Sequence, residues 1–261
     1  MSAYKIPTVK HNDLNTDNLI IKPPKTNNKG LGATLIARYK HDNDEKPLRT
    51  QTPRMIQAFD INADKRDDGS MSYSFNLSFR GDEENVKLEN FRKMLEQMDE
   101  HNIKYATENS ERIFGKKKSR EVIEENYTPM VKYSKKPGYR PTLKVKMPFY
   151  SEKPGFTVYN KQREMIPIEE DDEIDLSMFS AACEAIHLLE FTGLWLTNNK
   201  FGGSWKLIQT KMCSEPNQLA GYMMDEDSDD EEAVATEKVE DEDVISKVDL
   251  IDDDDTVSYT H

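Results

Sequence analysis

The chain has little cysteine and no long apolar segment. Among its 261 residues are only two cysteines, Cys183 and Cys213. This excludes a fold held by several disulfides and favours an intracellular, reducing compartment with two buried free thiols, with one Cys183–Cys213 disulfide as the alternative. No stretch of about 18 apolar residues is present, so we expect no membrane-spanning helix and no membrane partner. The first fifteen residues lack the apolar core of a secretory signal peptide.

Catalytic and metal-binding motifs are also missing. The sequence has no P-loop, no His-Glu-x-x-His, no Cys-x-x-Cys and no Gly-x-Ser-x-Gly. Its five histidines show no metal-ligand spacing with the cysteines. Gly30-Leu31-Gly32 begins like a dinucleotide-binding fingerprint, but Leu35 stands where the third glycine belongs. We therefore expect no cofactor, no resident metal and a binding protein rather than an enzyme. Scattered acidic residues still leave a two-metal nuclease open.

What the sequence does contain is charge, separated into two segments. Residues 132–163 hold nine basic residues and one acid, a net charge of +8, with aromatic residues interleaved. Residues 225–261 hold seventeen acids and two lysines, a net charge of −15. Because the whole chain carries −13, residues 1–224 carry +2. Cations neutralise phosphates and flat rings stack on unpaired bases. The pattern thus indicates a nucleic-acid-binding surface with an electrostatic competitor attached.

Composition divides the chain into three parts. Residues 1–30 are polar and predict a mobile N-terminal arm. Residues 31–213 predict one nucleic-acid-binding domain, and residues 214–261 predict a linker and a disordered acidic tail that cannot bury enough apolar surface to fold.

Within the domain, hydrophobic periodicity predicts strands separated by one helical region. Strands are expected at 33–39, 54–62 and 71–79, the last with strict alternation. Asp82 is expected to cap an amphipathic helix that runs through His101. Five prolines between 129 and 154 exclude a long helix there, and further strands are expected at 142–147, 155–160, 184–197 and 205–212. His187, Trp195 and Trp205 are predicted to be core residues.

A family resemblance rests on the order of several segments. These are PTLKVKMPFY and GFTVYN in mid-chain, a strand containing tryptophan, a Lys-Phe-Gly turn, Ser-Trp-Lys-Leu-Ile-Gln and an acidic tail. This order resembles the single-stranded-DNA-binding proteins of large nucleocytoplasmic DNA viruses, which are similar in plan to the phage replicative single-strand binders. The resemblance covers about residues 130–212 and the tail, and residues 1–128 match nothing in that family.

The resemblance implies a mainly β fold with added helices (α+β), built on a five-stranded oligonucleotide/oligosaccharide-binding (OB) barrel. It also implies coating of transient single strands, without reading sequence, during viral DNA replication or recombination. The place of action would be the site of viral DNA replication in the host cytoplasm or nucleus.

Candidate DNA-binding residues come from the basic strip and the last hairpin. Lys144 and Lys146 share one face of a strand and can line a phosphate path. Aromatic residues are candidate stacking platforms, with core packing as the alternative for each, and a merely solvated sheet face is the alternative for the lysines. The full set is Lys132, Tyr133, Lys135, Lys136, Tyr139, Arg140, Lys144, Lys146, Phe156, Tyr159, Lys200, Phe201 and Lys206.

The acidic tail is expected to lie over the basic strip until DNA displaces it. It would then recruit a replication polymerase or helicase, with Tyr259 as the partner-binding residue. Solubility alone is the plainer alternative for the tail. Two rival functions stay open: a chaperone of histones or other basic proteins acting through the tail, and an RNA-binding protein using the same barrel. The sequence also leaves open whether the chain forms an oligomer.

Overall fold

The computed structural model describes residues 7–26, 32–42, 44–66, 69–170, 173–197 and 200–213. The predicted linker and acidic tail, including Tyr259, lie outside the described residues.

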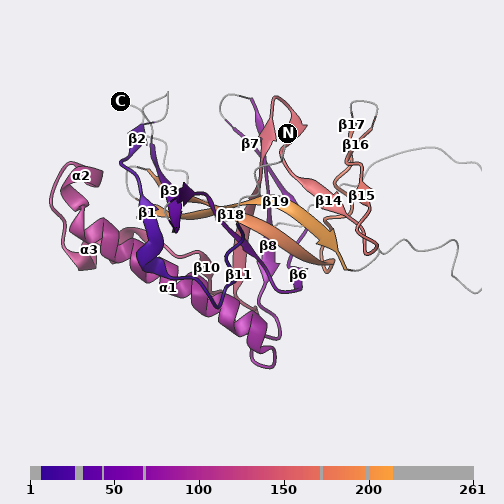
Figure 1. Cartoon of the computed structure of the whole chain (residues 1–261), viewed down its shortest axis with the longest axis horizontal. Coiled ribbons are helices and arrows are strands. Elements are labelled where there is room, and N and C mark those ends of the chain that lie inside the picture. Colours follow the sequence, from indigo (N-terminus) through magenta and orange to yellow (C-terminus); the bar gives the residue numbers. More distant parts are fainter. Residues whose placement is uncertain are drawn as a thin grey trace, which may run out of the picture. The chain divides into compact units, whose positions relative to one another are not determined.

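Five strands close into a barrel at the centre of the molecule (Figure 1). Going round the barrel, β6 is followed by β8, β11, β19 and β18, and β18 pairs with β6 again. Neighbours are antiparallel except β11 and β19, which are parallel. This confirms the predicted OB barrel within an α+β fold. The bounds are β6 Met55–Gln57, β8 Met71–Ser78, β11 Thr142–Met147, β18 Glu184–Leu196 and β19 Phe201–Met212.

Further strands, most of them short, extend the barrel along its edges. β5 and β3 pair with β18, β7 with β8, β9 and β14 with β19, and β10 with β11. Their bounds, with those of the other short strands, are β1 Leu19–Ile21, β2 Lys25–Thr26, β3 Ala33–His41, β4 Asp44–Lys46, β5 Leu48–Gln51, β7 Asn62–Lys65, β9 Tyr127–Thr128, β10 Val131–Lys132, β12 Phe149–Tyr150, β13 Lys153–Pro154, β14 Thr157–Tyr159, β15 Met165–Ile166, β16 Glu169–Glu170 and β17 Glu173–Ile174.

Alternating side chains fill the barrel. Phe75 and Leu77 of β8 are fully buried, and Leu143, Val145 and Met147 of β11 point the same way. His187 is a core residue, as predicted: its Nδ1 lies 3.0 Å from Thr210 Oγ1, and burial lowers its pKa to about 3. A histidine held neutral in this way belongs to the packing of the barrel.

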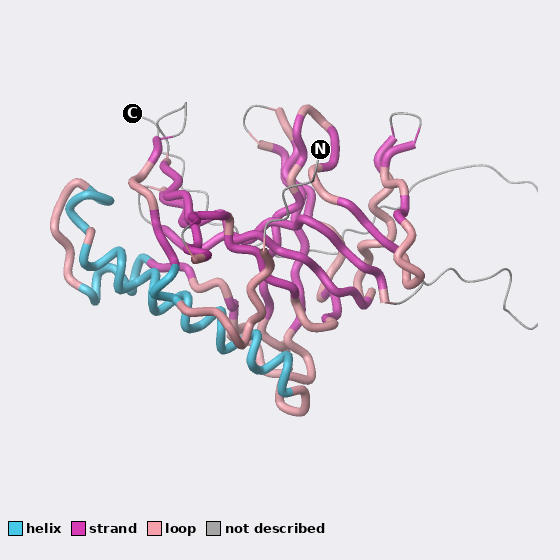
Figure 2. The backbone as a smooth tube through the Cα atoms, in the orientation of Figure 1, coloured by secondary structure: helices cyan, strands magenta, loops and turns pink. Residues whose placement is uncertain are grey.

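Three α-helices of the described residues lie together along one side of the strands (Figure 2). They are α1 Val86–Glu108, α2 Ser110–Phe114 and α3 Arg120–Asn126. The N-cap of α1 is Asn85, whose Oδ1 accepts the backbone N–H of Lys87 at 3.1 Å. This corrects the predicted cap, because the Asp82 carboxylate pairs with Arg92 instead. None of the described helices is both long and apolar enough to cross a membrane.

Most of the predicted N-terminal arm is part of the fold. β1 pairs with β3, and its Leu19 and Ile21 side chains are buried. The Tyr105 hydroxyl of α1 donates to the carbonyl of Ile21 at 3.0 Å. The described residues all lie in one compact unit. The prediction of a mobile arm therefore fails for residues 7–26, because three apolar residues among polar neighbours are enough to add a strand to an open edge.

Candidate nucleic-acid interface

A groove lies over the place where β11 and β19 run side by side. The two strands are paired at Val145–Trp205 and Lys146–Lys206 only, and residues 128–132 occupy the space beside them. The groove has a volume of about 310 Å³. Lysines from β10 and β11, Trp195 and residues 128–130 are among the residues that line it. We call it the first groove.

Three lysine side chains reach this groove from adjacent strands. Lys144 and Lys146 project outward because the alternate positions of β11 point into the barrel, and Lys132 comes from β10. Partial desolvation lowers the pKa of Lys146, and the charges of Arg66 and Lys144 lower it further. Three cations around one groove form an attractive site for phosphate.

Trp195 is half exposed and lines the first groove, which corrects its predicted place in the core. Trp205 is a core residue as predicted, 1% exposed, with its Nε1 donating to Met130 Sδ at 3.1 Å. Trp195 does not follow the simple alternation that would bury its ring, because β18 has register shifts at Leu188/Leu189 and Phe191/Gly193. Each shift changes which side chains face inward, so simple alternation fails beyond it. The signal for this in the sequence is the glycine at 193.

The backbone wall of the groove is fastened to α1 by a buried carboxylate. Asp99 accepts the Tyr127 hydroxyl at 2.5 Å and the backbone N–H of Met130 at 3.0 Å. Asn102 Nδ2 donates to the same Tyr127 oxygen at 3.1 Å. Burial raises the pKa of Asp99 to about 7, although these hydrogen bonds act in the opposite direction. Asp99 thus positions the wall, a role that the sequence did not predict.

Two glycines in β19 let this wall approach. A Cβ at Gly202 would lie 2.5 Å from the carbonyl oxygen of Thr128, and a Cβ at Gly203 would lie 2.5 Å from Met130 Sδ. The sequence predicts a turn at these glycines, but β19 already begins at Phe201. Their function in the fold is to allow another segment to cross close to the strand.

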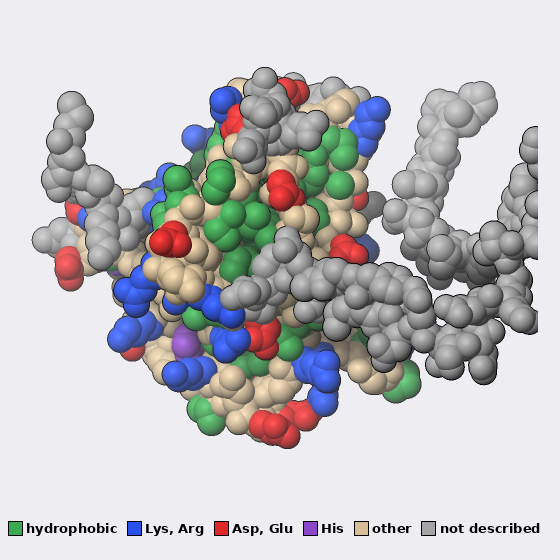
Figure 3. Space-filling model, turned by 90° about the vertical axis from the view of Figure 1, so that its right-hand side faces the viewer, with side chains coloured by type: hydrophobic (Ala, Val, Ile, Leu, Met, Phe, Trp, Pro, Cys, Tyr) green, Lys and Arg blue, Asp and Glu red, His purple; other side chains and the backbone are tan. Residues whose placement is uncertain are grey.

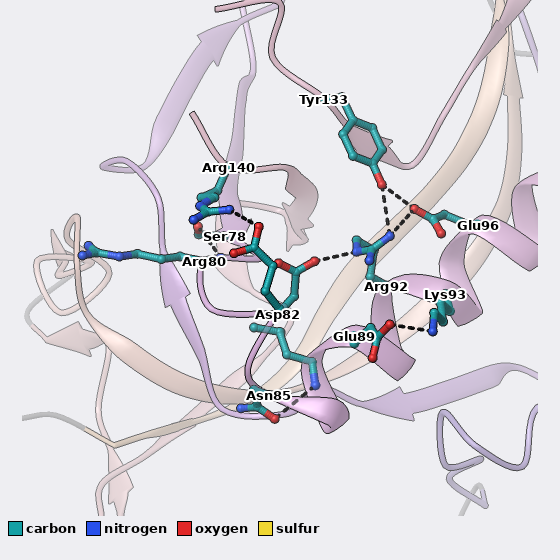
Figure 4. A network of polar contacts seen from close by, with 12 residues as sticks. Ser78, Arg80, Asp82, Asn85, Glu89, Arg92, Lys93, Glu96, Tyr133 and Arg140 are labelled. Carbon is teal, nitrogen blue, oxygen red and sulfur yellow. Dashed lines mark hydrogen bonds and ion pairs between the residues drawn. The ribbon is translucent and has the colours of Figure 1, made fainter. Parts of the chain in front are cut away.

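The basic loop between β10 and β11 is tied to acidic residues around the start of α1 (Figure 4). The Tyr133 hydroxyl donates to Glu96 at 2.5 Å and accepts a hydrogen bond from Arg92 at 3.2 Å. Arg140 donates to Glu83 at 2.6 Å. Lys135, Lys136 and Tyr139 are exposed in the same loop. The structure thus brings the predicted residues 132–140 into one hairpin, of which Lys132 lines the first groove.

Two predicted stacking residues are inside the protein. Phe156 is 5% exposed and packs against Phe149 and Phe179. Phe201 is 1% exposed and contacts the rings of Tyr127 and Phe114. A stacking role does not fit either ring, because neither face is open to a base. Phe201 is the first residue of β19 and Phe156 lies just before β14, and both side chains face the core.

The remaining predicted residues do not line the first groove. Lys200 is exposed before β19, and Lys206 is half buried with its Nζ 3.0 Å from Glu190. Tyr159 lines a different groove of about 430 Å³, further along β19, which we call the second groove. Among the described residues, no group of three His, Cys, Asp or Glu side chains could hold a metal ion.

The fold and the first groove define an OB-barrel protein with a cationic and aromatic groove on its outer surface. Its residues 76–226 match the model of a family of unknown function, DUF5871, and the chain belongs to that family. A search of curated protein sequences finds no match.

Two solved structures similar to this chain come from one bacteriophage. One is the single-stranded DNA-binding protein from bacteriophage Enc34, with 10% identity and a TM-score of 0.39, covering 79% of this chain and 96% of that chain. The other is a C-terminal truncation of the same protein, with 11% identity and a TM-score of 0.37, covering 77% of this chain and 97% of that chain. At these scores the likeness carries no function over to this chain.

Proposed function

We propose that this protein binds single-stranded DNA without reading its sequence, and that the first groove is the centre of the binding site. One observation carries the proposal: Lys132, Lys144, Lys146 and the half-exposed Trp195 ring line the same groove. The lysines supply charge for phosphates and the ring supplies a surface for a base. The groove includes β11, the third strand of the barrel, and OB folds bind oligonucleotides on the face of their second and third strands.

A single strand is the form of nucleic acid that this groove suits. An indole ring can stack on a base only where the base is not already stacked between its neighbours. Stacking also tolerates every base, because each has a π face, so the arrangement favours binding without sequence preference.

The biological role that we propose follows from the resemblance of the sequence to viral single-stranded-DNA-binding proteins. The protein would act as a binding protein, not an enzyme, and coat transient single strands at the site of viral DNA replication or recombination. Residues 225–261, with their net charge of −15, would compete with DNA for the basic strip of net charge +8. Once displaced, they would recruit a polymerase or helicase through Tyr259.

The test is fluorescence-anisotropy binding of the full chain to a labelled oligo-dT across a salt series, with duplex DNA and RNA as competitors. We expect Trp195→Ala to weaken binding by about 1–3 kcal/mol, the usual contribution of one stacked base. Lys144→Gln with Lys146→Gln should reduce the salt slope by about 1.4, because each phosphate contact on a single strand contributes about 0.7. Lys40→Gln, which removes an exposed charge on β3, is the control and should bind normally.

The same assay tests whether the acidic segment competes with DNA. A protein limited to residues 1–224 should bind oligo-dT more tightly than the full chain at low salt. Equal affinity of the two would refute competition by the acidic segment. Equal binding by Trp195→Ala and the control would refute the first groove as the binding site, and stronger competition by RNA than by DNA would identify an RNA-binding protein instead.

A further inference from the structure

The second groove lies on the outer face of the barrel, at the opposite end of β19 from the first. It is formed over β5, β14, β18 and β19, and Tyr159 stands beside Lys211 in the paired strands β14 and β19. The Tyr159 ring is half exposed, and Gln51 and Gln209 add two exposed amides. The side of the molecule that carries β14 and β15 shows hydrophobic side chains with both basic and acidic side chains around them (Figure 3).

The two cations of this groove, Arg163 and Lys211, have no carboxylate partner among the described residues. By contrast, Lys206 is paired with Glu190 and Arg140 with Glu83. Within the part of the chain that the structure describes, no acidic side chain lines the groove. Cations without a carboxylate partner beside a partly exposed aromatic ring are the combination that binds the phosphates and bases of a single strand.

The position of Arg163 is fixed by a turn between β14 and β15. Arg163 has φ +69° and donates its backbone N–H to the carbonyl of Asn160 at 3.1 Å. Asn160 also binds Glu164 twice: its Oδ1 accepts the backbone N–H at 2.9 Å and its Nδ2 donates to the carboxylate at 2.8 Å. The turn therefore holds the neighbouring acid on Asn160 while Arg163 borders the groove.

Both grooves lie along β19, which connects them. The first groove includes Ser204 and Trp205, and the second includes Gln209, Thr210 and Lys211. Ser204 of the first groove and Gln209 of the second are five residues apart, or about 17 Å along an extended strand. We propose that the second groove is a second subsite for the same single strand, with Tyr159 stacking on a base and Arg163 and Lys211 binding phosphates. This inference rests on the proposed function, since it extends the strand bound in the first groove.

The length of the bound strand tests the second subsite. Full-length protein and the double variant Arg163→Gln/Lys211→Gln would be compared on labelled oligo-dT of about 4 and about 16 nucleotides, the range that one OB fold occupies. We expect equal affinity for the short strand and at least about fivefold weaker binding of the long strand at low salt, with the salt slope reduced by about 1.4. Tyr159→Leu should weaken binding of the long strand while leaving its salt slope unchanged.

The control is Lys40→Gln/Lys104→Gln, which removes two exposed charges outside both grooves and should match the wild type on both strands. Unchanged binding of the long strand by the Arg163/Lys211 variant would refute the second subsite and leave the first groove intact. An equal loss on both strands would also refute it. Tighter binding by the variant would refute it too, and would identify an acidic part of the chain as the occupant. Failure of the wild type to bind either strand would overturn the proposed function itself.

Discussion

At the scale of single residues, Asp99 has the most unusual environment among the described residues that shape the first groove. Its carboxylate is 8% exposed and holds both Tyr127 and the backbone of Met130. Burial raises its pKa from 3.8 to about 7. The folded protein therefore binds more protons at this site than the unfolded chain between these pH values. The stability that comes from the neutral carboxyl is complete below pH 4 and is lost as pH rises through 7.

We predict that Asp99→Asn removes this pH dependence. Between pH 5 and pH 8 the free energy of unfolding of the wild type should fall by about 2–3 kcal/mol relative to the variant, since one pKa unit corresponds to about 1.4 kcal/mol. Urea unfolding of both proteins at four pH values measures the difference. Asp64→Asn, which changes an exposed aspartate on β7, should keep the wild-type pH dependence. Parallel profiles for wild type and Asp99→Asn would contradict the prediction.

At the scale of the element, the path of β18 requires a glycine where β3 pairs with it. Gly193 has φ +114°, and a Cβ there would lie 1.9 Å from the carbonyl oxygen of Leu35. The close approach allows β18 to pair with β3 beyond the bulge while it pairs with β19 on its other edge. The same bulge turns Trp195 toward the first groove.

We predict that Gly193→Ala lowers the free energy of unfolding by more than about 4 kcal/mol, because it combines backbone strain with a clash against a main-chain atom. Gly81→Ala is the matched control. Gly81 has φ +87° with nothing within 4 Å of an added Cβ, so only strain of about 1–2 kcal/mol applies. Urea unfolding of both variants measures the two costs, and similar losses would show that the contact with β3 contributes little.

At the scale of the whole molecule, the N-terminal residues extend the sheet instead of trailing from it. Ile21 is 6% exposed in β1, whereas its neighbour Ile20 is half exposed on the other face. We predict that Ile21→Ala costs about 2–5 kcal/mol of stability, the range for a buried isoleucine, and that Ile20→Ala costs clearly less. Thermal unfolding of the two variants provides the comparison. Equal small losses would return residues 7–26 to the role of a loosely attached arm.

Local patterns in the sequence determined much of the barrel and the cationic face. Strict alternation located β8 and β11, and it placed Lys144 and Lys146 on one face because strand side chains alternate whatever the neighbouring strand is. The hydrophobic spacing of α1 and the segregation of charge along the chain are likewise properties of short sequence segments, so they do not depend on tertiary contacts. These features gave individual strands, the helix and the basic half of the candidate site, whereas the OB class was implied by the family resemblance.

Only the tertiary structure decided which aromatic rings reach solvent and which segments pair. Phe156 and Phe201 face the core, and Trp195 faces the groove because bulges in β18 change its alternation. The wall held by Asp99 and the strand added by residues 19–21 depend on contacts between residues far apart in the chain. A sequence pattern shows the period of one element, whereas the burial and pairing of that element are set by the elements packed against it. A one-residue shift in the register of a strand moves every side chain beyond the shift to the other face.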